Sequence, residues 1–162
     1  MVKGTIRLFE EGSVNDQNRA LKTAYLDECA SLVAHCFSHE TSLFFSGFLE
    51  RWHNHHARVI ATFEQESSPQ NTEKWAGLPQ QFLTQRARMF SALAQGLSKE
   101  HQANFLRDQM KNYLREHDII FIRILNAQHE MLKKELNDAQ NVRTAIGAYA
   151  RSARQMGDAN LW

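Results

Sequence analysis

The chain has 162 residues, of which 43% are hydrophobic and 23% charged, and its 19 basic residues nearly balance its 18 acidic ones. This length supports one domain with a real core, and the interspersed charges disfavour a nucleic-acid-binding protein. No run of about eighteen apolar residues occurs, so no transmembrane helix is expected. With only two prolines and seven glycines, the chain predicts an all-α fold. We expect an elongated antiparallel bundle of three to four helices with a very long C-terminal helix.

Residues 1–12 predict a flexible N-terminal arm. The first sixteen residues contain no continuous apolar segment of the kind found in signal peptides, so a cytoplasmic location is expected. A single helical-bundle domain is predicted over 13–157. A short tail over 158–162 is expected to be mobile.

The first helical segment begins near Ser13, which forms a capping-box-like pair with Asp16. Apolar residues then recur at helical spacing as far as Phe63. Ser38 and Thr41 lie near the middle, and serine is a favoured N-cap. The pattern leaves open whether this is one helix of about fifty residues or two stacked helices.

Two cysteines, Cys29 and Cys36, lie seven residues apart on one side of this helical segment. Two helical turns separate them by about 10 Å, which is too far for a disulfide within a regular helix. We expect two buried thiols that act as small hydrophobic side chains.

The clearest linker is the segment 67–72, which has the sequence SSPQNT. Pro79 suits the first position of a helix that runs to Gln95. Gly96 is expected to end that helix and Ser98 to cap the next one. Such a short connection predicts an antiparallel pair.

The last helical segment runs from Lys99 to about Ala153 without a proline, and Gly147 is its only glycine. Its apolar stripe passes through Leu106, Met110, Tyr113, Phe121, Leu125, Gln128, Leu132, Leu136, Ala139, Val142, Ile146 and Tyr149. A helix of this length spans roughly 80 Å, more than a compact domain of this size is wide. The part beyond Leu136 is therefore predicted to be the least covered, and to be a natural docking surface. Gly157 is expected to end this helix or a final short one.

Eight histidines suggest a search for a metal site. His35 and His39 are spaced i, i+4, and Glu50 with His53 forms a Glu-x-x-His element of the kind found in di-iron bundles. A second such element is missing from the sequence, so no metal or cofactor is expected, and these four residues are kept only as an alternative metal site.

Three histidines, His53, His55 and His56, span more than one helix face and predict an exposed cluster. The sequence contains no nucleophile elbow, no P-loop and no dinucleotide-binding glycine pattern. We therefore expect no enzymatic activity and no catalytic residues.

The last helical segment resembles the end of the flagellar type III export chaperones of the FlgN/FliT-like kind. The resemblance rests on His117-Asp118, Ile124-Leu125, the run from Gln128 to Leu136, Arg143 and Ala148-Tyr149. It implies a small cytoplasmic helical protein without enzymatic activity. Its partner would be an exported flagellar subunit of the cap or hook-junction type, bound through an amphipathic helical segment, with the export apparatus as a further partner.

The partner-binding residues expected from this resemblance lie along the stripe of the last helix. They are Leu125, Leu132, Leu136, Val142, Ile146 and Tyr149. For Leu125 and Leu132 a role in the bundle core is at least as well supported. The alternatives are a metal-binding bundle and a self-associating coiled coil. A homodimer stays open, because a client and a second copy would bury the same residues.

Overall fold

The computed structural model describes residues 14–65 and 72–159, and its side chains over 16–62 and 77–152. Over these residues the chain forms four helices and no strand. They are α1 (Val14–Cys36), α2 (His39–Gln65), α3 (Thr72–Leu97) and α4 (Ala103–Ala159). The predicted all-α class is confirmed, and so is the very long C-terminal helix, which has 57 residues. None of the described helices is long and apolar enough to cross a membrane.

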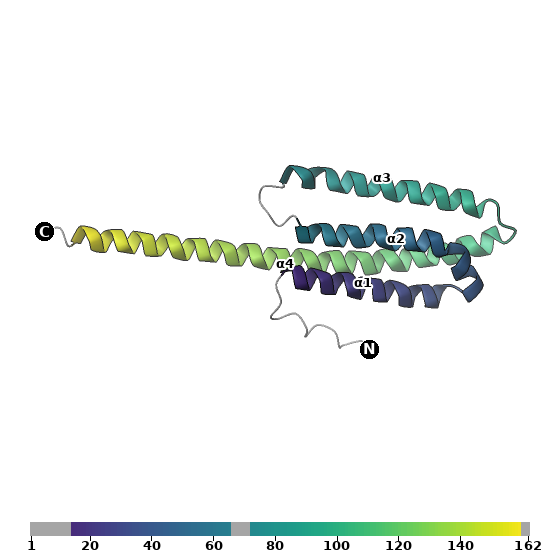
Figure 1. Ribbon diagram of the computed structural model, residues 1–162, viewed down its shortest axis with the longest axis horizontal. Helices are drawn as coiled ribbons and strands as arrows, with labels where there is room; N and C mark the ends of the chain where they lie inside the picture. Colours follow the sequence, from purple (N-terminus) through teal and green to yellow (C-terminus); the bar gives the residue numbers. More distant parts are fainter. Residues whose placement is uncertain (1–13, 66–71, 160–162) are drawn as a thin grey trace. The chain divides into compact units, whose positions relative to one another are not determined.

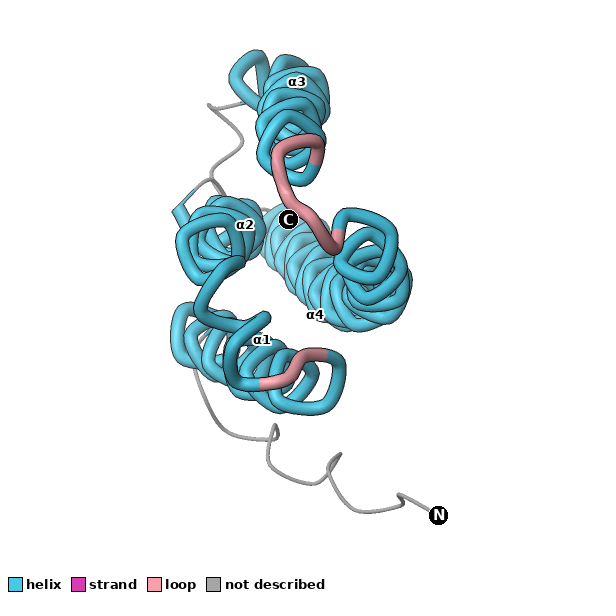
Figure 2. Tube along the Cα trace, turned by 90° about the vertical axis from the view of Figure 1, so that its right-hand side faces the viewer, coloured by secondary structure: helices cyan, strands magenta, loops and turns pink. Residues whose placement is uncertain are grey.

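The chain divides into two compact units, residues 1–128 and residues 129–162, and α4 continues from the first into the second. Within the first unit, each helix runs antiparallel to the one before it (Figure 1). Seen end-on, α1 and α3 lie on opposite sides of the pair formed by α2 and α4 (Figure 2). The predicted arm over 1–12 lies outside the described residues. So does the predicted tail, except for residues 158 and 159, which end α4.

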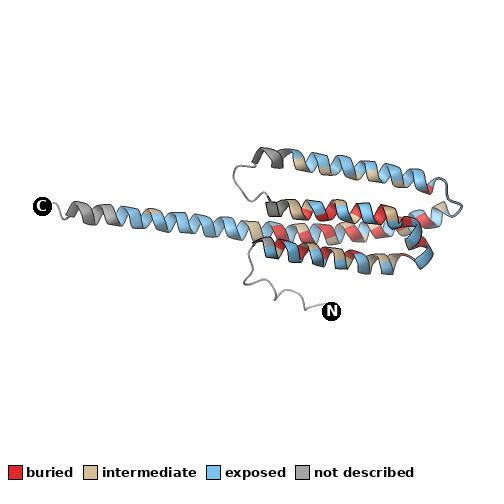
Figure 3. Ribbon diagram, in the orientation of Figure 1, coloured by how far each residue is buried: buried red, intermediate tan, exposed pale blue. Residues whose placement is uncertain are grey.

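Buried residues in the first unit follow one stripe on each of α1, α2 and α4, at steps of three and four residues (Figure 3). The stripes include Leu21, Tyr25 and Cys29 on α1; Phe45, Phe48, Leu49, Trp52, His56 and Ile60 on α2; and Leu106, Met110, Tyr113, His117, Phe121, Ile124 and Gln128 on α4. Helix α3 is more exposed and packs mainly through half-buried Phe82, Arg86, Met89 and Leu93. The core of the first unit therefore lies between α1, α2 and α4.

The first helical segment is broken into two helices at Ser38, which settles the alternative that the sequence left open. The backbone N–H of Thr41 donates to Ser38 Oγ over 3.4 Å, and the N–H of Ser42 donates to the Ser38 carbonyl over 2.8 Å. Ser38 is therefore the N-cap of α2.

Replacing Ser38 with alanine should lower the free energy of unfolding by about 1 kcal/mol, because amide groups of the first turn of α2 lose their acceptor. Urea unfolding followed by circular dichroism measures the change. Ser46→Ala is the matched control on the same helix, since that hydroxyl only donates to the Leu43 carbonyl at an exposed position. Equal losses for the two variants would contradict the capping role.

Four predicted helix boundaries are wrong. Helix α3 begins at Thr72, so Pro79 lies inside it; a proline removes one backbone hydrogen bond, and here the cost is confined to the first turns of a long helix. Gly96 lies in the last turn of α3, and Ser98 Oγ donates to the Gln95 carbonyl over 2.8 Å, so Ser98 closes α3 and does not cap α4. Helix α4 runs past Gly157, the predicted stop.

The turn between α3 and α4 explains why no left-handed glycine is needed there. Lys99 N–H donates to the Gly96 carbonyl and Glu100 N–H to the Leu97 carbonyl, each over 3.2 Å. These tight i→i+3 bonds satisfy carbonyls at the end of α3. No described residue has a positive φ. The antiparallel pairing of α3 and α4 is as predicted (Figure 1).

Candidate functional site

The second unit carries most of the predicted partner-binding residues on the exposed surface of α4. Leu136 is 61% exposed, Val142 58%, Ile146 62% and Tyr149 78%. They belong to one stripe that also passes through Ala139, because the steps from Leu136 through Ala139 to Tyr149 are all three or four residues. Four large apolar side chains in one exposed stripe are typical of a protein interaction surface. We call these four residues the α4 stripe.

The other two predicted partner-binding residues, Leu125 and Leu132, are half-buried. Leu125 belongs to the first unit and lines a mostly apolar pocket of about 380 Å³. Other residues of its lining include Val59 of α2, Phe82 of α3 and Phe121 of α4. Leu125 is therefore placed apart from the exposed stripe.

The buried stripe of α4 ends at Gln128, the last residue of the first unit. Its side-chain Nε2 donates to Asn18 Oδ1 over 3.0 Å and to the Ile60 carbonyl over 2.6 Å. Among the described side chains that follow on α4, none is buried. This polar residue thus joins α4 to α1 and α2 at the end of the core.

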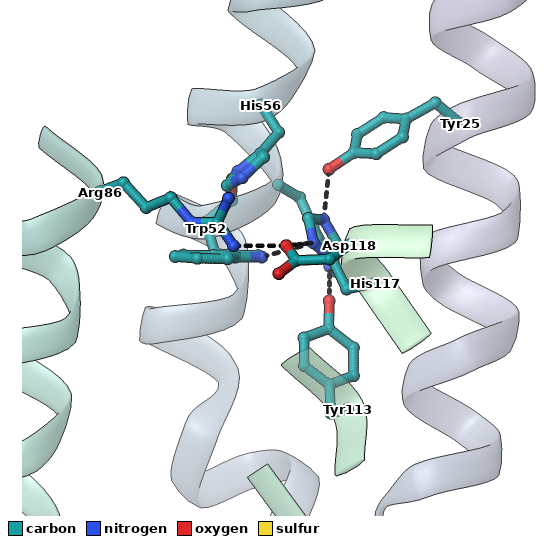
Figure 4. A network of polar contacts seen from close by, with 8 residues as sticks. Tyr25, Trp52, His56, Arg86, Tyr113, His117 and Asp118 are labelled. Carbon is teal, nitrogen blue, oxygen red and sulfur yellow. Dashed lines mark hydrogen bonds and ion pairs between the residues drawn. The ribbon is translucent and has the colours of Figure 1, made fainter. Parts of the chain in front are cut away.

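A second candidate site lies in the core of the first unit, where histidines, tyrosines and a tryptophan meet (Figure 4). His117 is fully buried, and Trp52 Nε1 donates to its Nδ1 over 3.1 Å. A neutral imidazole that accepts at Nδ1 carries its proton on Nε2, which lies 2.7 Å from the Tyr25 hydroxyl. Tyr25 in turn hydrogen-bonds with Cys29.

The same cluster includes two histidines of α2. His53 hydrogen-bonds with the Tyr113 hydroxyl, and His56 Nδ1 donates to the Trp52 carbonyl over 2.7 Å. Arg86 of α3 lies 5.1 Å from the centre of the Trp52 ring. The cluster is therefore built by side chains from all four helices.

The charge of this cluster is held near neutral by burial. Desolvation lowers the pKa of His53 to about 4, of His56 to about 3 and of His117 to about 2, since a buried imidazolium loses its hydration. Burial also raises the pKa of the Cys29 thiol to about 11. The Arg86 guanidinium, which lies over the Trp52 ring, is paired with the Asp118 carboxylate. At neutral pH the three imidazoles are uncharged.

The histidine predictions need two corrections. His56 is buried and His53 and His55 are half-buried, so the predicted exposed cluster is wrong, because helices pack on more than one face of α2. The alternative metal site of His35, His39, Glu50 and His53 is not assembled either. His35, His39 and Glu50 are all exposed, and only His53 belongs to the described group that has metal-ligand geometry.

Comparisons with protein-family models, with curated proteins and with solved structures found no match. The fold, the exposed stripe and the buried cluster therefore rest on the residues of this chain alone.

Sequence reasoning missed His117 and Cys29 as members of a polar cluster. The signal for His117 was present, because it lies four residues after Tyr113 and four before Phe121, on the same buried stripe. A histidine at such a position must find hydrogen-bond partners in the core. Cys29 was predicted to be buried, and it is. Cys36 is only half-buried.

Proposed function

We propose that this protein is a helical chaperone or adaptor that binds an amphipathic helical segment of an exported flagellar subunit. The observation that supports the proposal best is the exposure of Leu136, Val142, Ile146 and Tyr149 in one stripe of α4. Sequence resemblance to the FlgN/FliT-like export chaperones suggests the kind of client, a cap or hook-junction subunit. The proposal assigns no reaction to the protein.

The mechanism is burial of one apolar helix face on another. A client segment that is disordered when free becomes ordered on binding and covers the α4 stripe. The apolar face of the client is then buried and cannot drive self-assembly of the client. Ordering the client offsets part of the gain from apolar burial, so the complex is expected to be reversible. Release at the export apparatus then requires no covalent step.

The double change Leu136→Asp/Tyr149→Asp should weaken client binding by about 100-fold or more, because each large side chain contributes about 1.5–3 kcal/mol when buried. Calorimetric titration of the full chain with purified terminal segments of the cap and hook-junction subunits measures the effect. Thermal unfolding should change little, since both positions are exposed.

Asn137→Asp/Asn141→Asp is the matched control. It adds the same charge to the opposite face of the same helical segment, where both residues are exposed, and should leave binding unchanged. Equal binding by the two double variants would refute the proposed site. A dimer that the stripe change converts to a monomer, with no client binding by the wild type, would assign the stripe to self-association.

A further inference from the structure

Three potential metal ligands from three helices converge in the core of the first unit. The Cys29 Sγ atom of α1 and one ring nitrogen each of His53 on α2 and His117 on α4 all lie within 4.8 Å of one another. It is the one group of three or more such residues with this geometry in the described part of the chain. None of the three ligands follows another on the same helix, so tertiary packing alone brings them together.

The donor set suits a borderline transition metal such as Zn²⁺. One thiolate and two neutral imidazoles bind zinc at about 2.3 Å and about 2.0–2.1 Å, which places ligand atoms roughly 3.5 Å apart in a tetrahedral site. Side-chain rotations that move ligand atoms by about 1 Å convert the observed spacing to this geometry. Three protein ligands leave the fourth position to water or to a tyrosine hydroxyl, and Tyr25 and Tyr113 already hydrogen-bond to the histidines.

The surroundings of His117 provide the support that a metal-binding imidazole needs. When Nε2 binds a metal, Nδ1 must carry the proton and donate it to an acceptor. Asp118 Oδ1 lies 3.8 Å from His117 Nδ1, and Arg86 holds that carboxylate in place by an ion pair. In the structure Nδ1 accepts from Trp52 Nε1 instead, so metal binding at Nε2 requires this bond to break.

We propose that Cys29, His53 and His117 form a binding site for one Zn²⁺-like transition metal ion in the core of the first unit. His53 is the ligand closest to solvent, since it is only half-buried while Cys29 and His117 are fully buried. A bound ion would tie α1, α2 and α4 together. This inference does not depend on client binding, because the α4 stripe lies in the other unit.

Cobalt titration of the full chain tests the proposal directly. The protein is unfolded in denaturant in the presence of a chelator, the chelator is removed, and the chain is refolded with Co²⁺. Unfolding is needed because the buried site would otherwise block entry of the metal ion. We expect one equivalent to bind with a near-ultraviolet thiolate-to-cobalt absorption band and the visible bands of tetrahedral cobalt. Zn²⁺ should displace Co²⁺ and raise the thermal midpoint of the wild-type protein.

The variants identify the ligands. Cys29→Ser should abolish the thiolate band, and His53→Gln or His117→Gln should weaken binding by more than about 100-fold. Cys36→Ser is the matched control, because it removes the other free thiol of α1 and should keep the band. Asp118→Asn should keep the band while lowering affinity by about 10- to 100-fold, as a positioning residue would.

Two results would overturn the site. One is a wild-type protein that refolds with Co²⁺ but shows neither the band nor a Zn²⁺-dependent rise in thermal midpoint. The other is a thiolate band that persists in Cys29→Ser or disappears in Cys36→Ser. If Cys29→Ser does not fold, two other variants test the site. The site then requires that His53→Gln, at a half-buried position, weakens Co²⁺ binding and that Cys36→Ser keeps the thiolate band.

Discussion

Acidification from about pH 7.5 to about pH 4.5, in the presence of a chelator, is expected to unfold the first unit. Burial holds the pKa of His56 at about 3 and that of His117 at about 2, far below the ordinary histidine value of 6.5. Below pH 6.5 the unfolded chain therefore binds protons that the folded chain does not. The free energy of unfolding falls by about 1.4 kcal/mol per pH unit for each such histidine.

The combined effect is large compared with the stability of an ordinary domain. Two fully buried histidines give a slope of about 3 kcal/mol per pH unit, and His53 adds to it down to about pH 4. Since domains are stable by about 5–15 kcal/mol, two to three pH units suffice to unfold many of them. Urea titrations at a series of pH values, followed by circular dichroism, measure the slope.

The His56→Phe variant distinguishes the contribution of the histidines to the pH dependence of stability from that of the carboxylates. His56 lies against the rings of Trp52, Phe82 and Phe121, and its buried Nε2 has no hydrogen-bond partner within the described residues. A phenylalanine therefore fits the site and removes one titrating group. The slope should fall by about 1.4 kcal/mol per pH unit. An unchanged slope would show that protonation of His56 does not contribute to the acid sensitivity.

Replacing Trp52 with alanine should lower the free energy of unfolding by about 3–5 kcal/mol, because it leaves a cavity in the core and deprives His117 of a donor. Trp52 is fully buried and contacts the rings of Phe48 and Phe90. Trp52→Phe keeps most of the packing and should cost less, mainly through the lost N–H···Nδ1 bond. Urea unfolding at pH 7.5 is the measurement.

Leu83→Ala serves as the control for this change. Leu83 is a large apolar residue of α3 that is 56% exposed, so its truncation should cost about 0.5 kcal/mol or less. A Trp52→Ala protein as stable as Leu83→Ala would show that the polar cluster is not part of a packed core.

The class of the fold and most core residues could be predicted from the amino-acid sequence. Few helix breakers and apolar residues at steps of three and four require long amphipathic helices, whatever their arrangement. Leu106, Met110, Tyr113 and Phe121 were therefore predicted on the buried stripe of α4, and they are buried. The exposure of Leu136, Val142, Ile146 and Tyr149 followed from length, since the other helices are too short to cover a helix of 57 residues.

Which polar residues come together in the core depends on how the helices pack. Cys29, His53 and His117 are 24 and 64 residues apart in the chain, and helical spacing relates side chains only within one helix. Helix boundaries depend on local hydrogen bonds. Ser38 Oγ accepts from Thr41 N–H and caps α2, whereas Ser98 Oγ donates to the Gln95 carbonyl at the end of α3. Periodicity identifies the buried face of each helix, but the packing of three such faces determines what that core can bind.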